Sequence, residues 1–116
     1  MITIWHNPRC GKSRDGLKLL DEKGVKYELF EYLKQPISIQ DIKNLISMLG
    51  ISDVREMLRT KEKEYKELHL DDSEKTQEDI IYTVMKNPKL IERPIVIKDN
   101  KAAIGRPLEN IIELLG

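Results

Sequence analysis

The sequence predicts an α/β fold with a mixed sheet, in which a helical insertion separates two halves of the chain. Three observations predict it: a β-α-β pattern at the start, a β-β-α pattern at the end, and apolar residues at helical spacing between them. The length of 116 residues suits one domain. We therefore expect a single domain over residues 1–116, with the insertion at about residues 37–92.

The first half begins with a short apolar run, Ile2 to Trp5, that stops at the breaker cluster His6-Asn7-Pro8, as a strand does when it leaves a sheet. From Gly11 the pattern becomes helical, and Gly24 marks the end of that helix. Apolar and aromatic residues in Tyr27 to Leu33 predict a second strand. Because such units hold their strands parallel, we expect these first two strands to be parallel.

The middle of the chain is predicted to be helical. Ser38 with Asp41 resembles a capping box, and Thr76 with Asp79 predicts the start of a later helix. Between them, Ser52 is expected to begin another helix, followed by a charged stretch. The residues expected on the apolar faces of these segments are Ile42, Leu45, Ile46, Leu49, Val54, Met57, Leu58, Tyr65, Leu68, Ile80, Ile81, Val84 and Met85.

The end of the chain returns to strands. The runs Pro94 to Lys98 and Lys101 to Gly105 are separated by Asp99-Asn100, which predicts a two-residue hairpin. Pro107 suits the first turn of a last helix. The apolar stripe of that helix is Leu108, Ile111, Ile112 and Leu115. This order of elements is the thioredoxin arrangement with helices inserted between its two halves. In that arrangement we expect the first strand, Ile2 to Trp5, to be buried at the centre of the sheet.

Charge and composition exclude several classes of protein. With 20 basic and 20 acidic residues and a pI near 6.7, the chain is not a general binder of nucleic acid or anionic membranes. No apolar run is long enough to span a bilayer, and the first residues lack the pattern of a signal peptide. One cysteine cannot form an internal disulfide, which agrees with a reducing compartment. We expect a cytoplasmic monomer that contacts neither nucleic acid nor membrane and holds no metal or bound cofactor.

The single cysteine, Cys10, is the main candidate for chemistry. A lone cysteine is more often a small buried hydrophobe, but Cys10 follows a predicted strand and opens the helix that begins at Gly11. The free N–H groups and the dipole of a helix N-terminus stabilise a thiolate, and they also bind oxyanions. His6 lies one turn of loop before Cys10, and Ser13 can donate a hydrogen bond to the sulfur. Positive side chains nearby are Arg9, Lys12 and Arg14.

Three other arginines, Arg59, Arg93 and Arg106, stand next to chain breakers or helix ends. Any single surface arginine is more often a solvated charge. The last two, however, precede prolines at the start of a predicted strand and of a predicted helix, which puts guanidinium groups at the sheet end where Cys10 is expected. Guanidinium groups suit tetrahedral oxyanions because their donors match the spacing of the oxygens.

Taken in order, the segments HNPRCGKSR, MLR, ERPIVI and GRP resemble the glutaredoxin-dependent arsenate reductase family, above all its short uncharacterised members. The resemblance covers essentially the whole chain. It implies a thioredoxin-like fold and the reduction of arsenate to arsenite, with arsenate or a similar oxyanion as the substrate. Glutathione is then the external reductant and glutaredoxin the protein partner.

The resemblance also assigns roles to residues. It implies that Cys10 attacks the oxyanion, that His6 helps to activate it, and that the three arginines named above bind the oxyanion. We expect Asn7 and Ser13 to shape the loop and to hydrogen-bond the sulfur. A thioredoxin-like chain further implies a cis peptide bond before Pro94, beside the active cysteine.

The sequence departs from the family pattern in two places. The characterised reductases continue in a tail beyond the last helix, whereas this chain stops at Gly116. Gly105 replaces a cysteine that at least one reductase carries before its last arginine.

Other functions compete with a reductase that uses one thiol. Ser13 stands where dithiol oxidoreductases carry a second cysteine, so electrons must come from an external thiol. A regulator of the related Spx group, which binds RNA polymerase, is one alternative, although its redox-sensing members use the missing CxxC pair. A thiol oxidoreductase with another substrate is a second. Metal binding by His6, Cys10 and His69 is a weaker third, because these residues form no short spaced pair.

Overall fold

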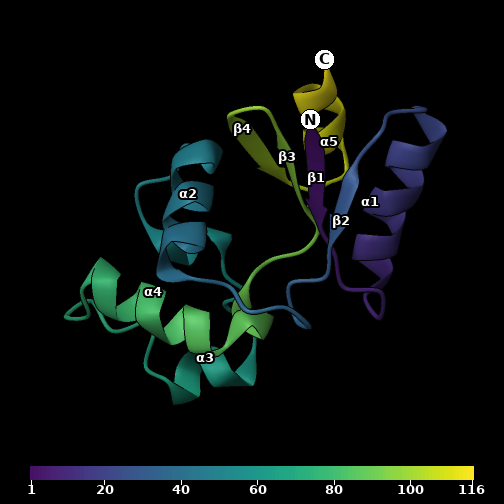
Figure 1. Cartoon of the computed structure of the whole chain (residues 1–116). Helices are drawn as coiled ribbons and strands as arrows, with labels where there is room; N and C mark the ends of the chain where they lie inside the picture. Colours follow the sequence, from purple (N-terminus) through teal and green to yellow (C-terminus); the bar gives the residue numbers. More distant parts are fainter. The chain divides into compact units, whose positions relative to one another are not determined.

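The computed structural model describes all 116 residues, and the chain divides into two compact units. The first unit comprises Met1–Pro36 and Arg93–Gly116, and the second comprises Ile37–Glu92 (Figure 1). The second unit has the bounds of the expected insertion, and the two predicted halves on either side of it fold together as the first unit. That the whole chain behaves as a single domain stays a prediction.

The first unit is built on a mixed four-stranded sheet with the strand order β2-β1-β3-β4 (Figure 1). Strand β1 (Ile2–Trp5) runs parallel to β2 (Glu28–Phe30) on one side and antiparallel to β3 (Ile95–Lys98) on the other. Strand β4 (Lys101–Ile104) pairs antiparallel with β3 to complete the sheet. The predicted α/β fold and the central position of the first strand are confirmed.

Helices α1 (Gly11–Glu22) and α5 (Glu109–Leu115) pack on one apolar cluster of the sheet. Ile4 lies at the centre of that cluster, fully buried and paired with Leu29 of β2 and Val96 of β3. Burial of this cluster stabilises the first unit by removing its apolar surface from water. Its buried members are Ile2, Ile4, Leu20, Val96 and Ile111.

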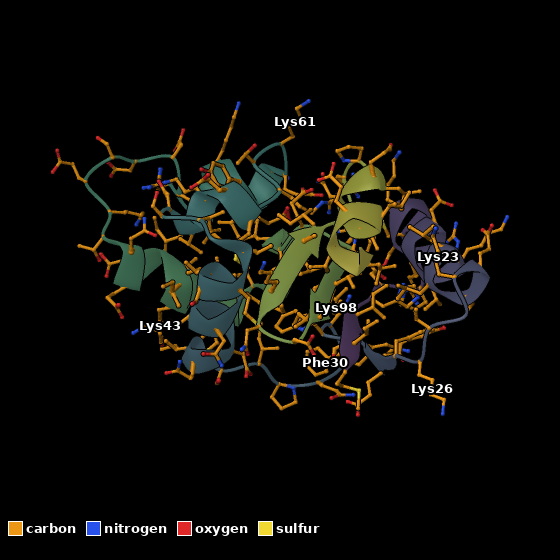
Figure 2. All side chains as sticks on the ribbon, turned by 90° about the horizontal axis from the view of Figure 1, so that it is seen from above. Lys23, Lys26, Phe30, Lys43, Lys61 and Lys98 are labelled. Carbon is orange, nitrogen blue, oxygen red and sulfur yellow. The ribbon has the colours of Figure 1, made fainter.

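A glycine conformation and a hydrogen bond mark the C-terminal ends of these two helices. Gly24 follows α1 with a φ of +67°, in the left-handed region that glycine adopts without strain, so the predicted stop is confirmed. Lys98 of β3, marked in Figure 2, donates a hydrogen bond of 3.0 Å from Nζ to the carbonyl oxygen of Leu115. That ammonium group lies at the negative end of α5, where the helix dipole favours it.

All the regular elements of the second unit are helices. It contains α2 (Ile39–Leu49), the 3-10 helix η1 (Val54–Met57), α3 (Lys63–Glu67), α4 (Gln77–Lys86) and the 3-10 helix η2 (Pro88–Leu90). None of the helices in the chain is both long enough and apolar enough to span a membrane. The buried apolar residues of the unit are Ile37, Ile42, Leu45, Val54, Met57, Leu58, Tyr65, Leu70, Ile80, Ile81, Val84, Leu90 and Ile91.

Both predicted caps are confirmed. Asp41 N–H donates to Ser38 Oγ at 3.0 Å, and Ser38 N–H donates back to the Asp41 carboxylate at 2.8 Å. Asp79 N–H donates to Thr76 Oγ1 at 3.1 Å at the start of α4. These bonds satisfy backbone donors that have no partner inside their own helix.

Three predictions about helical segments were wrong in detail. Ser52 does not begin a helix: Asp53 caps a single 3-10 turn, because its carboxylate accepts the N–H of Arg55 at 2.9 Å. Leu70, rather than Leu68, is fully buried in the charged stretch. In α5, Ile112 is 42% exposed, because the helix turns Ile111 toward the core.

The predicted bounds of two elements also change. Strand β2 covers three residues rather than Tyr27 to Leu33, because the chain turns away from the sheet after Phe30. Helix α5 begins at Glu109, two residues after Pro107.

Candidate functional site

Cys10 lies at the N-cap of α1, directly after the loop that leaves β1. Its backbone is extended, with φ −98° and ψ 123°. Its N–H donates to the carbonyl oxygen of Asn7, and its own carbonyl accepts the N–H of Arg14, both at 3.0 Å. These two bonds close the turn between strand and helix, and they put the sulfur at the positive end of α1.

The surroundings of the sulfur favour the thiolate. Partial burial raises the pKa of the Cys10 thiol, but a hydrogen bond from Arg93, the backbone N–H groups of Ser13 and Lys12, and the positive charge of Arg93 outweigh it. The pKa of Cys10 therefore lies below its ordinary value. A lowered thiol pKa at a helix N-terminus is the condition for a nucleophilic cysteine.

Two of the three predicted arginines, Arg93 and Arg106, lie beside Cys10 in the first unit. Arg106 Nη2 is 3.5 Å from the Cys10 sulfur, and Arg106 Nε donates to the carbonyl oxygen of Arg93 at 2.9 Å. Each arginine is joined to the following proline by a cis peptide bond. The cis bond expected before Pro94 is one of the two. The thiol is therefore bordered by two permanent positive charges from the two ends of the β3–β4 hairpin.

His6 and Ser13 form a buried pair behind the loop. His6 Nδ1 lies 2.7 Å from Ser13 Oγ, and the same oxygen accepts the N–H of Asn7 at 2.9 Å. The prediction that the Ser13 hydroxyl donates to the sulfur was wrong, because that hydroxyl is turned inward to His6 and Asn7. The backbone N–H of Ser13 makes the contact with the sulfur instead.

His6 is joined to Cys10 through Ser13. Burial is the main influence on its ring and lowers the pKa of His6, although the nearby carboxylate of Glu31 opposes the shift. A His6 side chain with a pKa below its ordinary 6.5 is neutral at pH 7. The ring can then fix the position of Ser13, and through it the backbone N–H that faces the sulfur.

The rest of the loop is held by side chains that sequence reasoning had placed there. Asn7 Oδ1 accepts the N–H of Arg9 at 3.1 Å, and Arg14 Nη1 donates to the carbonyl oxygen of Pro8 at 2.9 Å. The side chains of Arg9 and Lys12 are exposed. Asn7 thus makes contacts that shape the loop, but none of its bonds reaches the sulfur.

Arg59 belongs to the second unit. Its N–H donates to the carbonyl oxygen of Leu90 at 2.7 Å, and its guanidinium group forms an ion pair with Glu62. Its expected role in binding an oxyanion stays a prediction.

Sequence reasoning missed Tyr32, which is fully buried and interacts with the guanidinium group of Arg93. Its ring stacks on that of Trp5, with centroids 5.7 Å apart. The only sequence signal was the aromatic character of the segment, which had been interpreted as strand. A pocket of about 220 Å³ also borders the cysteine loop, and its lining residues are His6, Asn7, Pro8, Arg9, Glu31, Leu33 and Lys34.

No cluster of three or more His, Cys, Asp or Glu side chains is placed to hold a metal ion. The described residues place a thiol with a lowered pKa beside two guanidinium groups, and such groups can bind an anion.

Comparison with known proteins shows which group of proteins shares this arrangement. Residues 5–114 match the ArsC family. The chain belongs to the ArsC family. An "Uncharacterized protein YfgD" from Escherichia coli is 47% identical to it over 99% of this chain and 97% of that protein. An "Arsenate reductase" from Neisseria meningitidis is 44% identical over 98% of this chain and 97% of that protein.

A solved structure supports the same conclusion. The arsenate reductase from Vibrio cholerae superposes with a TM-score of 0.93 at 42% identity, over 97% of this chain and 95% of that one. The predicted family and the thioredoxin-like fold of this ArsC-family chain are thus confirmed.

Proposed function

We propose that this ArsC-family chain reduces arsenate to arsenite, with Cys10 as its only nucleophile and with glutathione and glutaredoxin as the source of electrons. The observation that carries the proposal is the convergence of Arg93, Arg106 and the N-terminus of α1 on one thiol whose pKa is lowered. The same donors that stabilise a thiolate can bind a tetrahedral oxyanion. Relatives matched over nearly their full length and named arsenate reductase support the same activity.

In the first step, the Cys10 thiolate attacks arsenic. An S–As bond forms and one As–O bond breaks, and the oxygen leaves as water after taking up protons. Arsenic stays in its oxidised state in this adduct. Arg93 and Arg106 would neutralise the charge on the remaining oxygens, since both guanidinium groups already face the sulfur.

In the second step, electrons arrive from outside, because the chain has no second cysteine. A glutathione thiol displaces another oxygen of the adduct as water and forms a second S–As bond. A glutaredoxin thiolate then attacks the glutathione sulfur, and the electron pair of that S–As bond passes to arsenic. Arsenic is reduced by two electrons, while glutathione and glutaredoxin become joined by a disulfide. Water finally releases arsenite and restores the Cys10 thiol.

His6 and Ser13 would act before these steps. By holding the turn at the start of α1, they keep the Ser13 N–H directed at the sulfur. Arg59 would supply a third positive charge once it exchanges Glu62 for the substrate.

The test is a coupled assay with arsenate, glutathione, glutaredoxin and a system that regenerates glutathione at the expense of NADPH. We expect arsenate-dependent oxidation of NADPH that disappears when glutathione or glutaredoxin is left out. The isosteric Cys10→Ser variant is the matched control, because it keeps the fold and removes the nucleophile. A wild-type rate no higher than that of Cys10→Ser at every arsenate concentration would overturn the proposal.

A further inference from the structure

Asn110, in the first turn of α5, is hydrogen-bonded to the loop that carries Arg106. Its Nδ2 donates to the carbonyl oxygen of Ile104 at 2.9 Å and lies 3.5 Å from the carbonyl oxygen of Arg106 itself. Its backbone N–H donates to the carbonyl oxygen of Pro107 at 3.1 Å. One half-buried side chain thus contacts both the last residue of β4, Ile104, and Arg106 in the connection to α5.

The other side of the same loop is fixed by the hairpin. Gly105 N–H donates to the carbonyl oxygen of Pro94 at 2.8 Å, and Arg106 Nε donates to that of Arg93 at 2.9 Å. Gly105 is buried, and a Cβ there would lie 2.7 Å from Ile111 Cδ1 and 2.8 Å from Pro94 Cγ, so these two side chains fill the space beside it. The loop is therefore held from two directions, by the β3 side and by Asn110.

Arg106 needs such support, because its side chain is exposed. A long exposed side chain has many rotamers, and ordering it costs conformational entropy unless its backbone is fixed. The contact between Arg106 Nη2 and the Cys10 sulfur, at 3.5 Å, depends on the direction in which that backbone points.

We propose that Asn110 is a positioning residue, which holds the Arg106 backbone so that the guanidinium group stays over the sulfur of Cys10. Asn110 itself touches neither the sulfur nor the binding place of the oxyanion. Its effect on arsenate reduction rests on the proposed function, but its effect on the charge beside Cys10 does not.

The primary experiment measures the charge at the thiol without any substrate. Cys10 is alkylated with iodoacetate, which is anionic, and with iodoacetamide, which is neutral, and the ratio of the two rates reports the positive charge beside the sulfur. In Asn110→Leu, which keeps the size of the side chain and removes both donors, we expect that ratio to fall about fivefold. That is about the factor that one unit charge at 4 Å produces in water.

A double-mutant cycle separates positioning from general loosening of the fold. In an Arg106→Ala background, Asn110→Leu should leave the ratio unchanged, because the charge that it displaces is already absent. Asn110→Ala is the second variant, since it also removes the donors to both carbonyl groups and adds no charge. Asn87→Leu is the matched control: Asn87 Nδ2 also donates one 2.9 Å bond to a backbone carbonyl, that of Thr83, but in the second unit.

The outcomes are distinct. An unchanged ratio in both Asn110 variants, or an equal fall in the Arg106→Ala background, overturns the proposal. If the coupled assay shows no arsenate reduction while the ratio falls as expected, only the proposed function fails. If arsenate is reduced, we expect Asn110→Leu to raise the KM for arsenate about fivefold with no change in the KM for glutathione.

Discussion

Replacing Arg93 by methionine should make Cys10 a weaker nucleophile near neutral pH. Methionine has a similar reach but no charge and no N–H donor, so the substitution removes both the hydrogen bond and the positive charge that lower the pKa of Cys10. A hydrogen bond to a charged group contributes about 1.5–3 kcal/mol, and the lower end applies to a half-buried sulfur. About 1.5 kcal/mol corresponds to a roughly tenfold smaller thiolate fraction below the thiol pKa.

Arg106 provides the comparison. Its guanidinium group is 3.5 Å from the sulfur but is exposed. In a medium with the dielectric constant of water, a unit charge at that distance contributes about 1.2 kcal/mol, and salt reduces it further. Arg106→Met should therefore have a smaller effect than Arg93→Met, and that effect should shrink as the salt concentration rises.

The assay is the rate of alkylation by iodoacetamide as a function of pH, followed by intact mass. We expect the midpoint of the rate profile to move to higher pH in Arg93→Met, with a smaller displacement in Arg106→Met. The reasoning is refuted if Arg93→Met has the wild-type midpoint, or if Arg106→Met moves it further than Arg93→Met does.

Arg93→Met should also change how the unfolding free energy depends on pH. Cys10 has a lower pKa in the folded chain than in the unfolded one, so its thiolate stabilises the fold above the unfolded pKa. That contribution disappears as the pH falls through the folded pKa. The difference in unfolding free energy between wild type and Arg93→Met should thus be larger at about pH 9 than at about pH 5. Urea unfolding monitored by Trp5, the single tryptophan, measures it, and Cys10→Ser should show the least dependence.

Three further substitutions test other parts of the structure. Ser13→Ala leaves the partly buried N–H of Asn7 and the buried Nδ1 of His6 without their partner, and it should cost about 1–3 kcal/mol in urea unfolding. A loss below about 0.5 kcal/mol, the size of an ordinary surface substitution, would contradict the buried pairing of His6 and Ser13. Gly105→Ala puts a Cβ about 2.8 Å from Pro94 Cγ and should destabilise the fold by about 1–3 kcal/mol. An unchanged thermal midpoint would show that the surrounding atoms can move to make room for the methyl group. Glu62→Gln removes the ion-pair partner of Arg59 and should lower the KM for arsenate up to about fivefold. An unchanged KM would argue that Arg59 does not bind the oxyanion.

Much of the fold could be predicted because its signals are local. The capping pairs at Ser38 and Thr76 act over three residues, and Gly24 adopts the positive φ that ends a helix. The position of Cys10 at the start of α1 follows from the same kind of signal. A strand that stops at a breaker and a helix that begins a few residues later leave little choice for the residue between them.

The partners of buried polar groups could not be predicted in this way. Ser13 was expected to face the sulfur because it follows Cys10 by three residues, yet its hydroxyl lies against His6, which precedes it by seven. The polar group with which a hydroxyl pairs depends on the path of the loop, and sequence spacing does not define that path. The contact between Tyr32 and Arg93 joins residues more than half the chain apart in sequence.

The adjacency of Arg93 and Arg106, by contrast, follows from the register of the β3–β4 hairpin. The two-residue turn at Asp99-Asn100 sets the register in which Ile95 faces Ile104. Extended outward by the same rule, this register places Pro94 opposite Gly105, which is where the bond from the Gly105 N–H is found, and Arg93 opposite Arg106. A turn signal and two arginines at equal distances from it therefore predict two adjacent guanidinium groups. A Cβ at residue 105 would lie 2.7 Å from Ile111 Cδ1 and 2.8 Å from Pro94 Cγ, which gives a physical reason for the glycine beside Arg106.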